Sequence, residues 1–166
     1  MLVALGVSGG IAAYKACEIV RGLDRVGVGV QVILTANAAQ FVTPLTLRTL
    51  ARRSVLLDPV DLAGEEGVRH IELTRPVDVL VVAPATANTM AKFARGIADD
   101  FLSTFYLAVT APVVLAPAMN TRMWLHPATR ENLAILTSRG HRIVEPAIGW
   151  LAEGETGWGR LAEPET

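Results

Sequence analysis

Short apolar runs alternate along this chain with longer stretches in which apolar and polar residues repeat at helical spacing. The apolar runs predict buried strands at residues 2–7, 28–35, 77–83, 112–116 and 141–144. The stretches between them predict helices at 11–26, 38–51, 86–96, 98–109 and 128–139. Strands separated by helices predict right-handed crossovers, and therefore an α/β fold with a doubly wound, Rossmann-like parallel sheet in a single three-layer domain.

Two parts of the chain fit this alternation less well. Pro44 interrupts the second helical stretch and predicts a kink or a restart there. Residues 52–72 have no regular period, and they contain a Gly/Glu-rich loop at 64–67 and His70 just before an apolar piece. The final residues, 162–166, are typical of the exit from a domain, so the chain is read either as a complete small protein or as one module of a longer one.

Composition narrows the class of function. A length of 166 residues fits one domain, and a net charge of -1 provides no basic stripe for nucleic acid or for a membrane surface. Small-molecule chemistry is therefore the better expectation. The single cysteine, Cys17, lies in a helical pattern and is expected in the core of a cytoplasmic protein, because the chain shows no secretory leader and no membrane-length apolar run. No group of His, Cys, Asp and Glu has the spacing of metal ligands.

The first strand ends in Ser8-Gly9-Gly10, where glycines let backbone N–H groups approach a phosphate at the start of a helix. The spacing is not the dinucleotide pattern, and the second strand ends in Leu34-Thr35 without an acidic residue for a ribose. These features favour a mononucleotide whose phosphate accepts a hydrogen bond from Thr35. A Gly-rich turn also occurs for purely steric reasons, so the alternative of a simple tight turn stays open.

Two further segments follow predicted strands. Residues 84–89, Pro-Ala-Thr-Ala-Asn-Thr, offer two hydroxyl groups, one amide and several backbone N–H groups, and Thr86 also suits a helix cap. Residues 117–124 place Asn120 directly after a buried strand, where its amide can hold a carboxylate or another amide. Because the carboxyl ends of parallel strands share one edge of a sheet, the three segments are expected to meet there and to form a flavin site.

The same segments carry a family resemblance. Residues 6–15 read Gly-Val-Ser-Gly-Gly-Ile-Ala-Ala-Tyr-Lys, residues 84–89 are followed by Gly-Ile-Ala-Asp-Asp at 96–100, and residues 117–124 read Pro-Ala-Met-Asn-x-x-Met-Trp. Together they resemble the flavin-dependent cysteine decarboxylases, and within that family the members that act on 4'-phosphopantothenoylcysteine. The resemblance covers essentially the whole chain. The Pro-Ala-Met-Asn element distinguishes it from the flavin prenyltransferases, which remain an alternative of the same fold.

The resemblance implies a flavodoxin-like subunit that binds FMN and assembles as a trimer or dodecamer, with the flavin between subunits. It also implies that the substrate thiol is oxidised to a thioaldehyde, that the adjacent carboxylate leaves as carbon dioxide, and that reduction then gives 4'-phosphopantetheine, a coenzyme A precursor. The residues that the motifs and the resemblance assign to FMN are Ser8, Gly9, Gly10, Ile11, Thr35, Pro84, Thr86, Ala87, Asn88 and Thr89.

Catalytic roles are carried over on the same basis. His70 corresponds to the active-site histidine, as a base or an orienting group, and Asn120 corresponds to the asparagine that holds the substrate carboxylate. The substrate-binding residues around Asn120 are Ala118, Met119 and Met123. Asp99 and Asp100 are interpreted as a helix start or a subunit contact rather than as acid catalysts.

One position departs from the family pattern. The substrate-covering flap, expected at about 147–162, carries in the family a proton-donating cysteine before Gly-x-x-Gly-x-Gly-Arg, and Glu153 takes that place here. A desolvated glutamic acid can donate the proton instead, whereas a flap glutamate in water would have no such role. In the second case the reaction stops at the enethiol, as in peptide-cysteine decarboxylases, or uses another donor. A non-catalytic flavin-binding subunit is a further alternative, which the presence of His70 and Asn120 disfavours.

Overall fold

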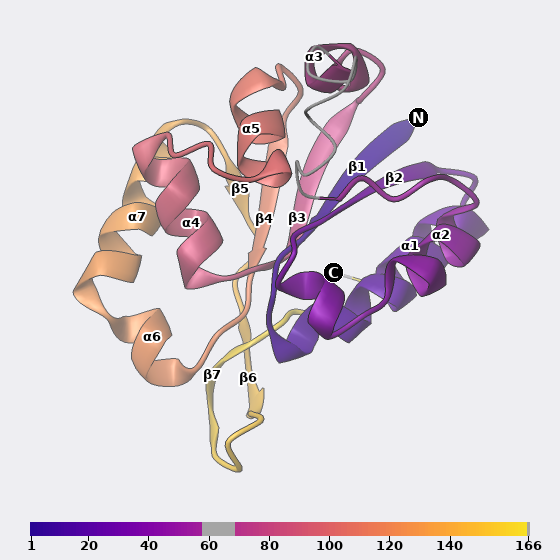
Figure 1. The fold of residues 1–166 in the computed structure, drawn as a ribbon. Helices are drawn as coiled ribbons and strands as arrows, with labels where there is room; N and C mark the ends of the chain where they lie inside the picture. Colours follow the sequence, from indigo (N-terminus) through magenta and orange to yellow (C-terminus); the bar gives the residue numbers. More distant parts are fainter. Residues whose placement is uncertain (58–68, 166) are drawn as a thin grey trace.

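Five parallel strands form the central sheet, in the order β2-β1-β3-β4-β5 (Figure 1). The computed structural model describes residues 1–57 and 69–165, and for residues 69–71 it describes the backbone only. The strands are β1 (Leu2–Val7), β2 (Gly29–Leu34), β3 (Val79–Ala85), β4 (Val113–Pro117) and β5 (Arg142–Ile143), with β6 (Ala147–Trp150) and β7 (Thr156–Arg160) in a separate pair. The helices are η1 (Ile11–Lys15), α1 (Ala16–Arg25), η2 (Ala38–Gln40), α2 (Pro44–Ala51), α3 (Arg69–Thr74), α4 (Ala87–Arg95), α5 (Phe101–Ala108), α6 (Thr121–Leu125) and α7 (Pro127–Ser138).

The predicted doubly wound sheet is confirmed. Its central strands are apolar because helices cover both faces: Leu5 of β1 is fully buried, and it pairs with Val32 of β2 and with Val81 of β3. The strand order changes direction between β1 and β3, which is the flavodoxin-like arrangement. In this arrangement, loops that follow β1 and β3 diverge at the carboxyl edge of the sheet and leave a crevice.

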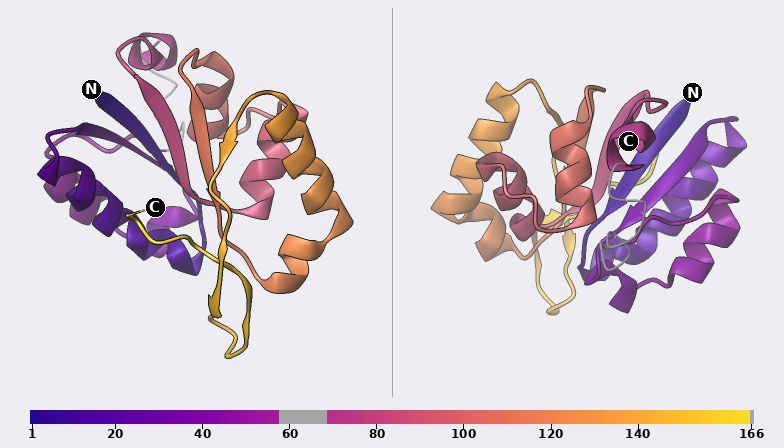
Figure 2. Two further views of the ribbon diagram at one scale, coloured as in Figure 1. Left: turned by 180° about the vertical axis from the view of Figure 1, so that it is seen from behind. Right: turned by 45° about the horizontal axis from the view of Figure 1, so that its top comes forward.

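Each face of the sheet has its own hydrophobic core. Helices α1 and α2 cover one face, where Val20 and Leu47 are fully buried. Helices α4, α5 and α7 cover the other, where Phe105 and Leu136 are fully buried (Figure 2). Each such side chain stabilises the fold by about 1.5–3 kcal/mol through removal from water. The predicted core position of Cys17 is partly reached: the side chain is half-buried against the first of these cores, and burial raises the pKa of its thiol.

Capping side chains set the helix boundaries. The interruption predicted at Pro44 is confirmed, because η2 ends before it and Thr43 caps α2, with Pro44 in the first turn. Asp100 caps α5 and forms a capping box with Ser103, as its interpretation as a helix start predicted. Helices α3 and α6 had no counterpart in the predicted elements.

Strands β6 and β7 form an antiparallel hairpin that projects from the carboxyl edge of the sheet (Figure 1). The sequence predicted a flap in this region but not its strands. Among the helices that the structure describes, none is long and apolar enough to cross a membrane.

Candidate functional site

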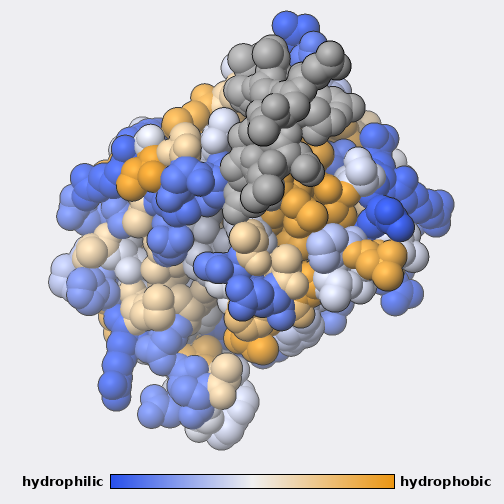
Figure 3. Space-filling model, viewed as in Figure 1, coloured by the Kyte–Doolittle hydropathy of each residue, from blue (hydrophilic) through white to orange (hydrophobic). Residues whose placement is uncertain are grey.

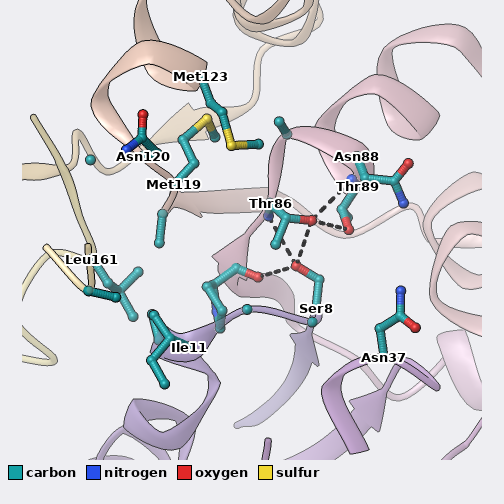
Figure 4. A pocket seen from close by; sticks show the side chains of 18 of the residues that line it. Ser8, Ile11, Asn37, Thr86, Asn88, Thr89, Met119, Asn120, Met123 and Leu161 are labelled. Carbon is teal, nitrogen blue, oxygen red and sulfur yellow. Dashed lines mark hydrogen bonds between the residues drawn. The ribbon is translucent and has the colours of Figure 1, made fainter. Parts of the chain in front are cut away.

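The three loops that the sequence singled out enclose one cavity at the carboxyl edge of the sheet. Its volume is 750 Å³, within the range of small-molecule sites. Every predicted site residue whose side chain the structure describes lines it, and these residues are Ser8, Gly9, Gly10, Ile11, Thr35, Pro84, Thr86, Ala87, Asn88, Thr89, Ala118, Met119, Asn120, Met123 and Glu153. Figure 4 shows Ser8, Thr86 and Thr89 at the centre, Asn37 on one side, and Met119, Met123 and Asn120 on the other.

Ser8 joins the two strands at the switch point. It is buried, and its hydroxyl donates to the backbone oxygen of Pro84 at 2.7 Å. The Oγ atom of Ser8 in turn accepts from the backbone N–H of Thr86 at 3.0 Å (Figure 4). These bonds fix the loop after β1 against the loop after β3, so the floor of the cavity is held rigidly by side-chain contacts rather than by the sheet alone.

The floor continues into the amino end of α4. The Thr86 hydroxyl accepts from the backbone N–H of Thr89 at 3.3 Å and thereby caps the helix. The N–H groups of the first turn point out of the helix at its positive end, a usual place for a phosphate. The Asn88 side chain is exposed and makes no hydrogen bond with any residue that the structure describes, so its amide is available to a ligand.

The loops after β1 and β2 meet at Gly9. A Cβ atom at Gly9 would lie 2.4 Å from the Cβ atom of Asn37, so the close approach of the two loops requires glycine there. This contact supports the steric interpretation of the Gly-rich turn, and the same glycine also leaves backbone groups open to the cavity. Thr35 accepts a hydrogen bond from the backbone N–H of Ala38 at 3.2 Å, which leaves its hydroxyl hydrogen for a ligand.

Asn120 is oriented by its own helix. Its Oδ1 accepts from the backbone N–H of Arg122 at 2.7 Å, and it caps α6 in this way. The amide oxygen is therefore occupied, and the NH₂ group is the part that remains for the cavity. That Nδ2 atom donates to Oε1 of Glu153 in the turn of the β6–β7 hairpin.

The hairpin is attached to the Asn120 loop along β7. The backbone N–H of Met119 donates to the oxygen of Gly159 at 3.0 Å, and the Thr121 hydroxyl donates to the oxygen of Trp158 at 2.7 Å. Gly159 has φ +122, and a Cβ atom there would lie 1.9 Å from the oxygen of Met119. Only glycine permits this approach, so the hairpin and the Asn120 loop form one unit.

Charged side chains around the cavity are paired. Lys92 contacts Asp99 and Asp100, each at 2.6 Å. Burial alone would lower the pKa of Lys92, but the two carboxylates outweigh it and raise the pKa, so the side chain is a cation already neutralised by its neighbours. On the opposite side, Lys15 is buried and contacts Glu163 at 3.0 Å.

Arg160 contacts the same carboxylate of Glu163. The Lys15 hydrogen bond and charge, with a smaller contribution from Arg160, hold the pKa of Glu163 below its usual range. These contacts attach the segment after β7 to η1, beside the cavity.

Sequence reasoning missed several lining residues, namely Tyr14, Lys15, Asn37, Lys92, Trp150, Arg160 and Leu161. Asn37 could have been found, because it follows the carboxyl end of the second predicted strand. Lys15 lies within the first quoted motif. Lys92 gives no local signal, since a lysine on a helix usually faces water.

His70 is the one predicted site residue whose side chain lies outside what the structure describes, and its backbone belongs to α3. Helix α3 leads into Val77 and Asp78 beside Leu2, at the amino edge of the sheet (Figure 1). Within one chain, α3 therefore lies at the amino edge of the sheet and the Asn120 loop lies at the carboxyl edge.

The other two histidines have structural partners. His126 caps α7 through its Nδ1 atom, and His141 hydrogen-bonds to the Tyr106 hydroxyl at 2.7 Å. Burial, and then the charge of Arg139, lower the pKa of His141. Within the described ranges, no cluster of three or more His, Cys, Asp or Glu residues is placed to hold a metal ion.

Comparison with known proteins follows this geometry. Residues 1–166 match the model of the Flavoprotein family. The chain is 48% identical over 163 residues to the coenzyme A biosynthesis bifunctional protein CoaBC of Bacillus subtilis, which covers 98% of this chain. It is 46% identical over 160 residues to the protein of the same name from Vibrio vulnificus. The chain spans about 40% of the length of these relatives.

Solved structures agree with the fold. A PPC decarboxylase mutant complexed with pantothenoylaminoethenethiol has a TM-score of 0.88 at 35% identity, and the match covers 99% of this chain and 92% of that one. The FMN-dependent cysteine decarboxylase SpaF has a TM-score of 0.84 at 35% identity, with coverage of 95% and 89%. The FMN binding protein AtHal3 has a TM-score of 0.83 at 35% identity, with coverage of 99% and 90%.

Proposed function

The chain belongs to the Flavoprotein family, and from this premise we propose that it is an FMN-dependent decarboxylase that converts 4'-phosphopantothenoylcysteine to 4'-phosphopantetheine. The observation that carries the proposal is the single cavity in which a phosphate-binding floor faces the NH₂ group of Asn120. The relatives named for coenzyme A biosynthesis and the PPC decarboxylase structure support it. The domain that performs this reaction is assigned to residues 1–166, with the hairpin as its flap.

The cavity fits FMN in chemistry and in place. In a flavodoxin-like sheet the crevice lies at the β1/β3 switch point, where Ser8 joins the two loops here. Thr35, Thr86 and Asn88 provide donors for a phosphate, as does the first turn of α4. Ile11 and Met119 provide apolar surface for a ring. When bound, the flavin supplies the two-electron oxidation of the substrate thiol and the later reduction.

Asn120 orients the group that leaves. Because its oxygen accepts from Arg122, it presents only N–H donors to the cavity, and these suit a carboxylate. Held in this way, the carboxylate is aligned for loss as carbon dioxide once the neighbouring carbon has been oxidised to the thioaldehyde level.

His70 reaches such a site from a second copy of the chain. Helix α3 lies at the amino edge of the sheet, away from the cavity of its own chain, so a neighbouring subunit supplies the histidine that orients or deprotonates the substrate. Exposed apolar residues support self-association: Ile11 and Tyr14 are 61% and 53% exposed beside the cavity. Figure 3 shows further apolar side chains at the surface on the side that carries α1 and α2.

A trimer or a dodecamer is the assembly that we propose, in the cytoplasm. Head-to-tail contacts that close into a ring would place the histidine of each copy at the cavity of the next one. Some of the apolar surface that single chains expose would then be buried between subunits.

Glu153 is assigned the proton donation that completes the product. Its side chain is exposed, and its carboxyl group contacts Asn120, beside the place where carbon dioxide would leave. A donor at this point would deliver a proton to the carbon that lost the carboxylate.

The test is direct. Purified protein loaded with FMN is given 4'-phosphopantothenoylcysteine, and carbon dioxide and thiol products are measured. We expect a yellow protein that releases carbon dioxide and forms 4'-phosphopantetheine, and an Asn120→Ala variant that stays yellow but reacts on the order of 100-fold more slowly. A colourless protein, or a yellow protein without carbon dioxide release, would contradict the proposal.

A second candidate follows from Glu153. Because this residue stands where the family has its flap cysteine, the chain would stop at the enethiol if glutamate donates no proton. The two candidates differ in product mass by two hydrogen atoms, so mass spectrometry separates them. Glu153→Gln that still forms 4'-phosphopantetheine at the unchanged rate would remove Glu153 from the reaction.

A further inference from the structure

The orientation of Asn120 defines what can bind to it. Its Oδ1 atom is engaged by the backbone N–H of Arg122 at 2.7 Å, so exchange of the amide oxygen and nitrogen would place two N–H groups against each other. The NH₂ group therefore faces outward as a pair of donors with no acceptor beside it. Such a group binds a carboxylate in preference to an amine or ammonium group.

A carboxylate from the chain already meets these donors. Oε1 of Glu153 accepts from Nδ2 of Asn120, and Asn120 is the only described residue whose side chain bonds to Glu153. The nearby cations are engaged elsewhere, since Lys92 pairs with Asp99 and Asp100, and Lys15 pairs with Glu163. The position of Glu153 is therefore set by the amide and not by an ion pair.

The hairpin holds Glu153 in this position. Its turn is closed by bonds from the N–H of Leu151 to the oxygen of Glu155 at 2.8 Å and from the N–H of Gly154 to the oxygen of Leu151 at 3.0 Å. Strand β7 is bonded to the backbone of Met119 and to the hydroxyl of Thr121, on both sides of Asn120. The base of the hairpin is thus attached to the loop that carries the amide, whereas the turn, among the described residues, bonds only to itself and, through Glu153, to Asn120.

We propose that Glu153 is an internal stand-in for the substrate carboxylate: it latches the hairpin turn on Asn120 and is displaced when a carboxylate ligand binds. This inference rests on the proposed function, since it names the ligand carboxylate as the competitor. A ligand without a carboxylate binds with the latch closed. The latch therefore weakens binding of the acid but not of the decarboxylated product, and the turn recloses after carbon dioxide has left.

The experiment compares two unreactive amides of 4'-phosphopantothenate on FMN-loaded protein by calorimetry. The 2-aminobutyrate amide keeps the carboxylate and replaces the thiol by a methyl group, and the propylamide lacks both. In Glu153→Gln we expect the 2-aminobutyrate amide to bind about three- to tenfold more tightly, with binding of the propylamide unchanged, because a charged acceptor no longer competes for Asn120.

Glu155→Gln is the matched control. It removes the same charge from the same turn, but its side chain makes no bond to Asn120, so both amides should bind as they do to the wild type. If both variants bound the 2-aminobutyrate amide more tightly to the same extent, general repulsion between the turn and the ligand carboxylate would explain the effect. That result would overturn the latch. In an Asn120→Ala background, Glu153→Gln should change neither affinity.

A second readout needs no substrate. Hydrogen exchange across residues 150–156 should accelerate in Glu153→Gln relative to Glu155→Gln, and unchanged exchange would also overturn the latch. The outcomes separate the two proposals. If neither amide binds yellow wild-type protein, the proposed substrate is wrong. If the 2-aminobutyrate amide binds to the wild type, and the ratio of its affinity to that of the propylamide is the same in Glu153→Gln, only the latch proposal is wrong.

Discussion

At the scale of single residues, polar groups of the cavity make one hydrogen bond within the chain and keep another hydrogen-bonding position for a ligand. The Thr86 hydroxyl oxygen accepts from the backbone N–H of Thr89 and from the Ser8 hydroxyl, and Asn120 uses its oxygen on Arg122 and leaves its NH₂ group to the cavity. A group fixed by one bond presents the other in a defined direction, which reduces the ordering needed when a ligand binds.

Thr86 allows these two roles to be separated. Thr86→Ala should cost about 1 kcal/mol of unfolding free energy through the lost cap, and it should also weaken FMN binding. The matched control is Thr43→Ala, because Thr43 caps α2 with the same bond length of 3.3 Å, and the hydroxyl of each threonine contacts a second threonine three residues later. Urea unfolding should show similar losses, whereas FMN titration should respond only to Thr86→Ala. Equal FMN affinities would exclude Thr86 from the flavin site.

Asp100 provides a prediction about pH. Burial alone would raise its pKa, but bonds from Lys92 and from Ser103 outweigh burial and lower the pKa. A lowered pKa means that the stability from this carboxylate is present at neutral pH and is lost as pH falls below about 4. Asp100→Asn should therefore cost about 1–2 kcal/mol at pH 7, and its deficit should shrink toward pH 3 in urea unfolding.

The control for this measurement is Asp24→Asn. Asp24 forms an exposed ion pair with Arg52 at 3.4 Å, which contributes little to stability, so its loss should stay below about 0.5 kcal/mol. A deficit in Asp100→Asn that does not change between pH 7 and pH 3 would mean that the charge of Asp100 is not what stabilises the cap of α5.

At the scale of elements, the hairpin depends on one glycine. Gly159 lies against the oxygen of Met119 with φ +122, so Gly159→Ala introduces both backbone strain and a clash. We expect a loss of at least about 2 kcal/mol in unfolding free energy and weaker binding of the carboxylate-bearing amide, because β7 must move away from the Asn120 loop.

Gly140→Ala separates strain from clash. Gly140 has φ +84, but nothing lies within 4 Å of an added Cβ atom, so this variant should lose only about 1 kcal/mol and should bind the ligand normally. If Gly159→Ala bound the amide as well as Gly140→Ala does, the hairpin would not position Asn120.

The elements also show what sequence alone can predict. The strands were predictable because burial on both faces gives continuous apolar runs, and Thr86, Asp100 and Pro44 mark helix starts by local chemistry. The hairpin was not predictable as strands, because Trp150 and Trp158 remain exposed and no sheet face imposes alternation. Likewise α3 lies in a stretch without a period, and α6 is a single short turn after Asn120.

The position of the candidate site was predictable from the topology of the sheet, but its side-chain contacts were not. Loops after parallel strands converge, so the three segments could be expected in one cavity before their contacts were known. The Asn120–Glu153 contact and the Lys92 pairs join residues by tertiary geometry, which no spacing in the sequence encodes. The placement of α3 at the other edge is likewise a property of the fold.

At the scale of the whole molecule, that placement has a consequence for assembly. If Asn120 and His70 of one active site come from different copies in a closed ring, two inactive variants can complement each other. Asn120→Ala and His70→Asn should each be nearly inactive alone. After the two are unfolded together and refolded with FMN in equal amounts, random assortment should restore about a quarter of wild-type activity, because one site in four then carries both intact residues. A mixture as inactive as its parents, with an oligomer confirmed by light scattering, would show that each chain builds its site alone. Separate refolding before mixing is the control, since stable rings do not exchange subunits and should stay inactive.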